Sequence, residues 1–259
     1  MIVIGEKLNS SIPKTRELMA AKDHLALQEL VRLQVESGAD FIDINAGTFI
    51  STETEMMSWL VELVQEVTDK PLCVDTTNAD ALATALQLAQ KPALINSISM
   101  EGTRFEDVSR LALKFGSSVI GLCQTGEKIP DRAEERISAG IELAERLRHI
   151  GIPEENIYLD PLVNAVAVNQ QAAMTVFHTV QGLKAKVPFA KIVCGLSNVG
   201  FGLPKRKLIN RSFLAMLTAA GLDGAIIDPL DQEMMEMAYA SDMLAGKDFR
   251  CRRYLKMFR

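Results

Sequence analysis

The feature that most constrains how this chain folds is the regular alternation of short apolar runs with longer amphipathic stretches. Eight of these runs are rich in β-branched residues, as buried parallel strands are, and a helical pattern follows each of them. Eight strand–helix units in succession, without an extended Pro/Gly/Ser linker, predict a closed α/β barrel of the (β/α)8, or TIM barrel, type. The expected strands cover residues 2–8, 41–46, 71–76, 93–98, 117–123, 156–160, 191–196 and 224–228.

The length of the chain fits one such barrel. A chain of 259 residues that is 48% apolar and 24% charged can bury one large core. We therefore expect a single domain over residues 1–259. An open doubly wound sheet is the alternative architecture. Such sheets usually bind phosphates at a glycine-rich turn after the first strand, and neither G-x-G-x-x-G nor G-x-x-x-x-G-K-[ST] follows the first strand here.

Two helix starts carry a capping pattern. Thr52 with Glu55, and Thr103 with Glu106, fit the capping box, in which a hydroxyl and a carboxylate satisfy backbone N–H groups at the start of a helix. We expect helices to begin at both threonines. The stretch 131–151 is expected to form a longer amphipathic helix that buries its apolar side and carries its charges outward.

Charge and cysteine usage exclude several classes of protein. The net charge of -5 gives no general basic field, so we expect no nucleic-acid partner. The four cysteines lie far apart, which argues against a disulfide framework or a spaced zinc site. No apolar stretch approaches the roughly 18 residues of a membrane span. These features predict a protein of the reducing cytoplasm that binds no membrane.

The C-terminal segment 246–259 is unusually basic. It has six basic side chains and one acidic side chain, with aromatic residues between them. We expect an amphipathic terminal piece that packs on the barrel and carries its charges outward. A docking patch for an acidic partner is the alternative.

Polar residues stand at the ends of most apolar runs. Because side chains alternate along a strand, Cys73 shares a face with Asp75, and Cys194 shares a face with Asn198. If the last polar residue of each run points inward, the set converges on the barrel mouth, and both cysteines lie deeper as core packing. The alternative is that each residue caps the next helix or bonds to the loop backbone. The endings are Glu6, Asp43, Asn45, Asp75, Asn96, Asp160, Asn198 and Asp228.

Several kinds of chemistry can be weighed for this set. The three histidines end no strand, which argues against a zinc centre, and a Ser–His or Cys–His pairing is missing. A magnesium site from the four aspartates is possible, although Asn96 and Asn198 are unusual ligands for it. A mixture of carboxylates and amides suits a flat, nitrogen-rich heterocycle such as a pterin. The four aspartates are Asp43, Asp75, Asp160 and Asp228.

Seven motifs carry a family resemblance. The chain resembles the pterin-dependent methyltransferases, and among them the methyltetrahydrofolate:corrinoid protein methyltransferases, which are related to the folate domain of cobalamin-dependent methionine synthase. The match runs in order through almost the whole chain and includes YLKMF at residues 254–258. The motifs are GEKLN from residue 5, DINAG from 43, DTTN from 75, INS from 95, DPL from 160, GLSNV from 195 and LINRSFLAM from 208.

The resemblance implies a pterin-binding barrel, usually a homodimer, that moves a methyl group between N5 of tetrahydrofolate and the cobalt of a corrinoid. By motif match, Asp75, Asn96 and Asp160 are expected to hold the pterin, with Asp160 accepting the 2-amino and N3 hydrogens. Asn198 matches the family's asparagine beside N5 and is the expected catalytic residue, because it can donate a hydrogen bond to the leaving amine. The matched positions that line or support the site are Asp43, Asn9, Glu6 and Arg206.

The same resemblance assigns the substrates. Tetrahydrofolate or methyltetrahydrofolate is expected as substrate, and no bound metal is required. No D-x-H-x-x-G corrinoid-binding signature occurs, so a partner corrinoid protein is expected to dock transiently at the barrel mouth, over the loops around Thr48, Gly126 and Gly200. Lys205 or Arg206 is a candidate partner for the folate glutamate tail, with a solvated loop charge as the alternative.

Three other functions and the direction of transfer remain open at this point. A dihydropteroate synthase-like pterin enzyme shares the expected barrel and pocket. A non-catalytic folate-binding subunit and a magnesium-dependent barrel hydrolase are the further alternatives. The residues do not choose between methylation of a corrinoid protein and removal of its methyl group.

Overall fold

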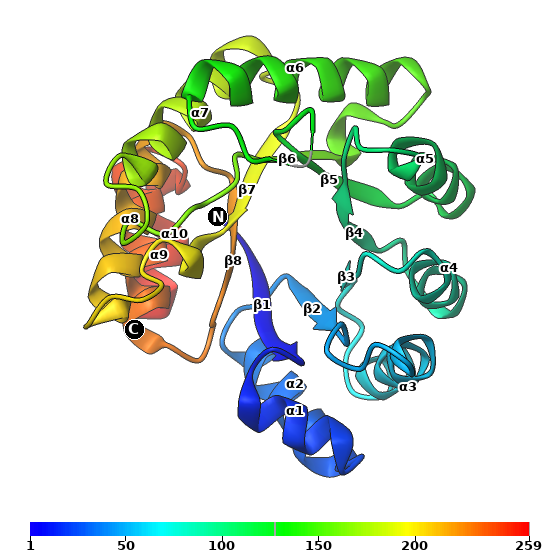
Figure 1. Ribbon diagram of the computed structural model, residues 1–259. Coiled ribbons are helices and arrows are strands. Elements are labelled where there is room, and N and C mark those ends of the chain that lie inside the picture. The colour runs from blue at the N-terminus through cyan, green and yellow to red at the C-terminus, as the bar shows by residue number, and fades with distance from the viewer. Residues whose placement is uncertain (127, 259) are drawn as a thin grey trace.

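The computed structural model describes residues 1–126 and 128–258, and it has the predicted (β/α)8 barrel fold. Glu127 and Arg259, which belong to the expected domain 1–259, lie outside the described residues. Eight parallel strands form a closed barrel in chain order, and β1 pairs with both β2 and β8. Because the ring is closed, the open doubly wound sheet is excluded. Figure 1 shows the strands in the middle of the molecule with the helices arranged around them.

All eight predicted strands are present. Each observed strand overlaps its predicted range, since β-branched and other apolar side chains fill both faces of a buried parallel sheet. The strands are β1 (Ile2–Asn9), β2 (Phe41–Asn45), β3 (Leu72–Asp75), β4 (Leu94–Ile98), β5 (Ser118–Leu122), β6 (Ile157–Asp160), β7 (Lys191–Gly195) and β8 (Gly224–Ile227).

The helices follow the strands along the chain, with a short additional helix, α1, between β1 and α2. Among the described helices, none combines the length and the apolar character needed to cross a membrane. The helices are α1 (Pro13–Ala20), α2 (His24–Glu36), α3 (Glu53–Gln65), α4 (Ala79–Leu88), α5 (Arg104–Phe115), α6 (Ala133–His149), α7 (Ala172–Lys186), α8 (Arg206–Ala220), α9 (Gln232–Leu244) and α10 (Arg252–Met257). The 3-10 turns are η1 (Glu154–Asn156), η2 (Leu196–Asn198) and η3 (Phe249–Cys251).

The expected capping boxes are wrong, although both helices start where they were predicted. Helices α3 and α5 begin directly after Thr52 and Thr103, but neither threonine side chain caps its helix in the described structure. The Thr103 hydroxyl instead donates to the Asp107 carboxylate at 2.8 Å. The exposed carboxylate four residues along the helix therefore replaces the backbone N–H as the partner of the hydroxyl.

The apolar core has two parts, inside and outside the barrel wall. The larger part lies between the strands and the surrounding helices, and the smaller part fills the barrel interior. Cys73 lies in the interior, as predicted. Cys194 does not, because its side chain points outward into the larger part of the core. The interior cluster consists of Ile4, Cys73, Leu94, Ile120, Tyr158 and Val193, with Ile2, Phe41 and Ile226 packed against it.

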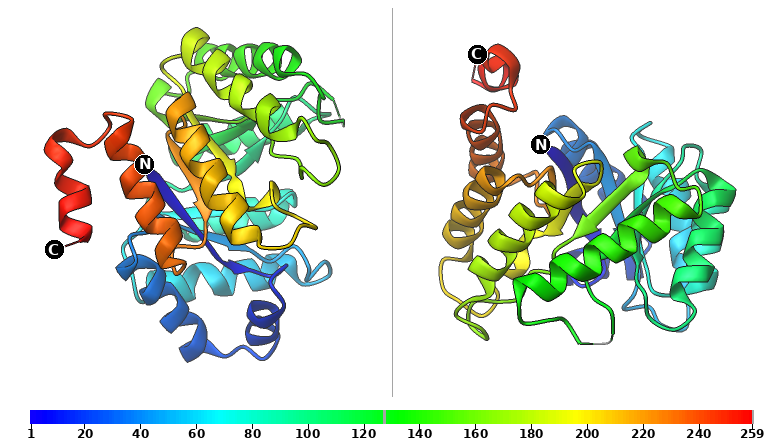
Figure 2. Two further views of the ribbon diagram at one scale, coloured as in Figure 1. Left: turned by 90° about the vertical axis from the view of Figure 1, so that its left-hand side faces the viewer. Right: turned by 90° about the horizontal axis from the view of Figure 1, so that it is seen from above.

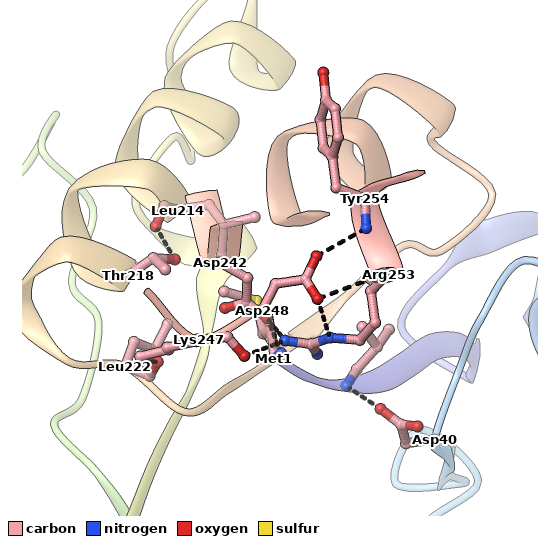
Figure 3. A network of polar contacts seen from close by, with 11 residues as sticks. Met1, Asp40, Leu214, Thr218, Leu222, Asp242, Lys247, Asp248, Arg253 and Tyr254 are labelled. Carbon is pink, nitrogen blue, oxygen red and sulfur yellow. Dashed lines mark hydrogen bonds and ion pairs between the residues drawn. The ribbon is translucent and has the colours of Figure 1, made fainter. Parts of the chain in front are cut away.

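The C-terminal segment packs on α9, outside the ring of helices, as Figure 2 shows. Its charges do not all point outward, which corrects the prediction. Arg253 contacts the buried carboxylate of Asp242 at 2.9 Å, and Asp248 accepts the backbone N–H groups of Arg253 and Tyr254 (Figure 3). Asp242 also pairs with the Met1 ammonium group. These contacts join the two ends of the described chain, and the alternative of an acidic partner for this segment stays a prediction.

The seam between β1 and β8 predicts a strict requirement for glycine at position 224. A Cβ atom at Gly224 would lie 2.8 Å from Ile2 Cβ and 2.9 Å from the Ile2 carbonyl oxygen, which belong to a strand that cannot move aside. We expect Gly224→Ala to lower the free energy of unfolding by about 1–3 kcal/mol, as measured by urea denaturation. Gly126→Ala is the control, because a Cβ there meets nothing within 4 Å. Equal urea midpoints for Gly224→Ala and the wild type would contradict this account of the seam.

Candidate active site at the barrel mouth

A polar layer lies directly above the apolar interior of the barrel. Each of its members stands two positions after a residue of the interior cluster, so strand alternation directs it to the same inner face. The carboxyl ends of barrel strands are where TIM barrels place their functional groups. The structure therefore brings together five of the predicted site residues at the mouth. They are Glu6, Asp43, Asp75, Asn96 and Asp160.

An irregularity in β1 adds a second side chain to this layer. Between Gly5 and Leu8 the pairing with β2 shifts, so that Glu6 and Lys7 stand opposite the single residue Asp43. A Cβ at position 5 would lie 2.5 Å from the Gln34 side-chain oxygen, so a larger residue there would displace the Gln34 amide. The same oxygen accepts the Lys7 N–H at 3.1 Å.

Lys7 reaches across the seam of the barrel. Its ammonium group contacts the Asp228 carboxylate at 2.9 Å, just after β8, and both side chains are partly exposed. The bulge in β1 thus allows two adjacent residues, Glu6 and Lys7, to place their side chains at the barrel mouth. Neither Lys7 nor Asp228 was among the predicted site residues, although Asp228 stands at a predicted strand end.

Asp75 is held by an amide whose orientation is fixed. The Asn45 side-chain oxygen accepts the Ser10 hydroxyl at 3.1 Å and the Gly47 N–H at 3.0 Å, so its amino group points to Asp75 at 2.9 Å. Burial raises the pKa of Asp75, while the Asn45 bond and the charge of Arg104 lower it. Asn45 therefore supports Asp75 as a hydrogen-bond acceptor.

Asp43 lies below Asp75 and is almost completely buried, with 1% of its surface exposed. Its Oδ1 atom has no hydrogen-bond partner among the described residues. Burial raises the pKa of this carboxyl well above its ordinary value, and the nearby Asp75 charge raises it further. Burial therefore favours the protonated form of Asp43, because an isolated buried charge is far more costly than a buried carboxylic acid.

Asp160 occupies the opposite side of the mouth, in a tight turn. It accepts the Leu162 N–H at 2.7 Å and the N–H of Gly195, and Leu162 adopts a left-handed φ of 64°. Burial raises the pKa of Asp160 to about 6, although these N–H groups and the charge of Arg136 lower it. Asp160 is thus mainly ionised at neutral pH, and its carboxylate is directed at the mouth.

Two guanidinium groups brace the loops that carry these acids. Arg136, which is 1% exposed, donates to the carbonyl groups of Pro130, Pro161 and Leu162. Its burial corrects the prediction that α6 carries its charges outward. A signal was present in the sequence, because Arg136 lies three, four and seven residues before buried positions and therefore belongs to the buried stripe of α6.

Arg104 braces β3 and β4 in the same way, by donating to backbone carbonyl groups. Its guanidinium donates to the Thr76 and Thr77 carbonyl groups at 2.9 and 3.1 Å and to the Ser97 carbonyl at 2.7 Å. It therefore connects the loop after Asp75 with the strand that carries Asn96. Arg104 is the first residue of α5, and no pattern in the sequence distinguishes it from an arginine on the surface.

The remaining predicted residues lie at the rim or in the loops. Asn198 is exposed in turn η2, so the argument that strand alternation continues from Cys194 to Asn198 is wrong. The Asn198 side-chain nitrogen nevertheless lies close to Gly195, 3.5 Å from the position that a Cβ atom on Gly195 would occupy. Arg206 donates to the Ser197 carbonyl at 3.0 Å, and the Asn9 side chain accepts the Ser11 N–H at 2.8 Å.

Glu6 is joined to turn η2 by Ser197. The Ser197 hydroxyl donates to the two carboxyl oxygens of Glu6, at 3.0 and 3.3 Å. Burial raises the pKa of Glu6 to about 7, and the neighbouring Asp228 charge also raises it, while the Ser197 bond, Lys7 and Arg206 lower it. Ser197 was not predicted as a site residue, because it stands out of phase with Asn198 in an extended strand.

The mouth therefore combines carboxyl groups and amides without an assembled metal site. Within residues 1–126 and 128–258, no group of three or more His, Cys, Asp or Glu side chains is arranged to hold a metal ion. Such a set can accept N–H groups and donate to ring nitrogens and carbonyl groups along the edge of a flat heterocycle.

Comparison with known proteins agrees with this geometry. The family model described as "Pterin binding enzyme" matches residues 9–228. The methylcorrinoid:tetrahydrofolate methyltransferase of Eubacterium limosum is 33% identical over 261 residues, which cover 100% of this chain and 96% of that protein. The methionine synthase of Mycobacterium tuberculosis is 27% identical over 244 residues, which cover 88% of this chain and 20% of that protein.

A solved structure supports the fold independently. The dihydropteroate synthase of Yersinia pestis, with a bound pterine-sulfa conjugate, superposes with a TM-score of 0.69 at 21% sequence identity. The superposition covers 94% of this chain and 93% of that chain. At this identity the likeness concerns the fold alone.

The bracing role of Arg136 leads to a stability prediction. Arg136→Lys keeps the positive charge but cannot reach all three carbonyl groups, so buried carbonyl oxygens lose their donors. We expect the free energy of unfolding to fall by about 2–3 kcal/mol in urea denaturation. Arg132→Lys, in an exposed ion pair beside the same helix, should change it by less than about 0.5 kcal/mol. Similar midpoints for the two variants would show that Arg136 does not brace the Asp160 loop.

Proposed function

The chain belongs to the family of pterin-binding enzymes, and we propose that it is a methyltransferase that moves a methyl group between N5 of tetrahydrofolate and the cobalt of a corrinoid. The observation that carries the proposal is the match, over its whole length, to a relative that is named for this reaction. The polar layer at the barrel mouth supports it, because carboxylates and amides there suit a pterin ring.

In this proposal Asp75, Asn96 and Asp160 hold the pterin. The Asp160 carboxylate accepts the 2-amino and N3 hydrogens, which lie side by side on the ring edge and match its two oxygens. Asp75 and Asn96 are paired residues of β3 and β4, so they approach the ring from the other side of the mouth. Asp43 supports these two from below, and burial raises its pKa. Asn9 supports the loop after β1.

The methyl transfer itself requires help at N5. A tertiary amine leaves poorly unless N5 gains a hydrogen bond or a proton as the bond to the methyl group breaks. Asn198 is proposed to donate that hydrogen bond from the rim, and the bond of Arg206 to the neighbouring Ser197 carbonyl fixes the turn that carries it. An amide cannot supply the proton at any ordinary pH.

The corrinoid is proposed to arrive on a partner protein. The loops that follow β2, β6 and β7, together with the first turn of α8, carry apolar side chains that are 61–86% exposed. Apolar side chains exposed at one rim are suited to a protein interface, and a transient complex needs only a modest one. The predicted docking loops around Thr48 and Gly200 belong to this rim. The exposed side chains are Ile50, Val168, Phe201 and Leu208.

The direction, the oligomeric state and the location are finer parts of the proposal. The Eubacterium limosum relative is named for transfer from methylcorrinoid to tetrahydrofolate, and we propose this direction. A homodimer follows from the family resemblance and is measurable by light scattering. Four unpaired cysteines, three of them buried, agree with a reducing cytoplasm.

An anaerobic spectroscopic assay tests the proposed reaction. Purified protein, free cob(I)alamin and methyltetrahydrofolate are mixed, and the conversion to methylcobalamin is followed; the reverse reaction starts from methylcobalamin and tetrahydrofolate. Transfer that Asp160→Ala abolishes is the expected result. Folate binding without transfer, even with a corrinoid protein, would favour a non-catalytic folate-binding subunit. Formation of dihydropteroate instead would favour the synthase alternative.

Asn198 should affect the rate of transfer more than folate binding. We expect Asn198→Ala to slow single-turnover transfer by about a hundredfold, as the loss of one donor to a transition state does. Calorimetry should give a methyltetrahydrofolate Kd within about threefold of the wild type. Asn169→Ala removes an amide from a neighbouring loop and is the control. Equal losses in rate and affinity would make Asn198 a binding residue only.

Folate affinity should depend on pH through Asp160. Because burial raises the pKa of Asp160 to about 6 and the pterin binds the ionised form, affinity is retained above this pH and lost below it. We expect the Kd from calorimetry to rise by up to about tenfold per pH unit below pH 6. Asp160→Asn should bind weakly and lack this dependence, whereas Glu142→Gln on the exposed side of α6 should keep it. A wild-type Kd that is constant through this range would exclude the role given to Asp160.

A further inference from the structure

Glu6 is a carboxyl group at the mouth that the pterin contacts proposed above leave unused. It lies on the inner face of β1 beside Asp43, and its oxygens accept the hydroxyl of Ser197, which is 191 residues away in the chain. Ser197 precedes Asn198 in turn η2. Glu6 is thus connected to the same short turn that carries the residue proposed to act at N5.

The charges around Glu6 leave it able to exchange a proton. The Lys7 ammonium pairs with the Asp228 carboxylate at 2.9 Å, so that Lys7 does not provide Glu6 with an unshared counter-ion. Arg206 donates to the Ser197 carbonyl rather than to Glu6. Burial is the dominant influence and raises the pKa of Glu6 to about 7. The charged or titratable groups that face it are Lys7 from β1, Asp43 from β2, Arg206 from α8 and Asp228 after β8.

The proposed reaction needs such a group. When the methyl group leaves methyltetrahydrofolate, N5 keeps the electron pair of the broken bond and must gain a proton. In the reverse direction the N5–H proton must be removed. The three histidines lie on the outer helices α2, α6 and α7, and the Asp160 carboxylate is engaged as the proposed pterin anchor.

We propose, on the basis of the methyl transfer proposed above, that Glu6 acting through Ser197 supplies the proton that N5 gains and takes it back in the reverse reaction. Protonated Glu6 donates to the Ser197 oxygen, which frees the serine hydroxyl to point toward the mouth. As the N5–methyl bond breaks, Ser197 passes its proton to N5 and receives the proton of Glu6, which becomes a carboxylate. The methyl group forms its new bond with the electron pair of Co(I), so the transfer is balanced.

The test combines Glu6→Gln, Ser197→Ala and the conservative Ser197→Thr in single-turnover transfer to free cob(I)alamin across pH. In the wild type, transfer from methyltetrahydrofolate should decline as the pH rises above about 7, since the acid form of Glu6 is lost. Glu6→Gln and Ser197→Ala should be slower by about a hundredfold and lack this decline, while Ser197→Thr retains it. Glu17→Gln, on the exposed side of α1, is the matched control.

Two further measurements separate the possible failures. Calorimetry should give similar methyltetrahydrofolate affinities for all variants, which shows that each is folded. Infrared difference spectra of the wild type should contain a carboxylic acid band that titrates near pH 7, and this band should be absent in Glu6→Gln. A Glu6→Gln rate within about threefold of the wild type, with the same decline, would overturn the role of Glu6 while the methyl transfer stands. A wild type that binds folate but transfers no methyl group, even with a corrinoid protein, would overturn the proposed function and this inference with it.

Discussion

The burial of several carboxyl groups at one end of a closed barrel is the constraint on which the rest of this structure depends. Removing such groups from water is costly unless each one is protonated, paired or hydrogen-bonded. The mouth uses several of these solutions. Burial raises the pKa of Asp43 and favours its protonated form, Asp75 receives the Asn45 amide, and Asp160 receives backbone N–H groups. Asp75 and Asp160 stay in the polar layer at the ends of their strands.

The two guanidinium groups that brace the loops at the mouth follow from the same constraint. An arginine placed directly on a carboxylate would lower its pKa strongly and occupy its oxygens. Arg104 and Arg136 instead donate mainly to backbone carbonyl groups of strand β4 and of the loops that follow β3 and β6. Their charge lowers the pKa of Asp75 and Asp160 from a distance. The loops are thereby held in place while the acceptor atoms remain available to a ligand.

The fold was predictable because it depends on the regular alternation of side chains along strands and helices. The parts that were missed lie where this regularity is interrupted, at a turn or a bulge. Alternation along five strands placed Glu6, Asp43, Asp75, Asn96 and Asp160 on one inner face. It failed after Gly195, where a 3-10 turn replaces the strand. Asn198 therefore lies at the rim and does not share a face with Cys194, which points to the outer core from within β7. In the bulge at Glu6 and Lys7, the Lys7 N–H donates to the side chain of Gln34 in α2. Contacts of this kind are made between distant segments, so that local pattern does not reveal them.

The apolar layer beneath the polar one has a kinetic consequence. Its six buried side chains fill the barrel below the mouth, so that a molecule bound to the polar layer enters and leaves at one end only. In the proposed reaction the flat ring lies underneath and the corrinoid protein covers it. In that arrangement folate would have to bind before the corrinoid protein and leave after it, and the lifetime of the protein complex would limit how fast folate is exchanged.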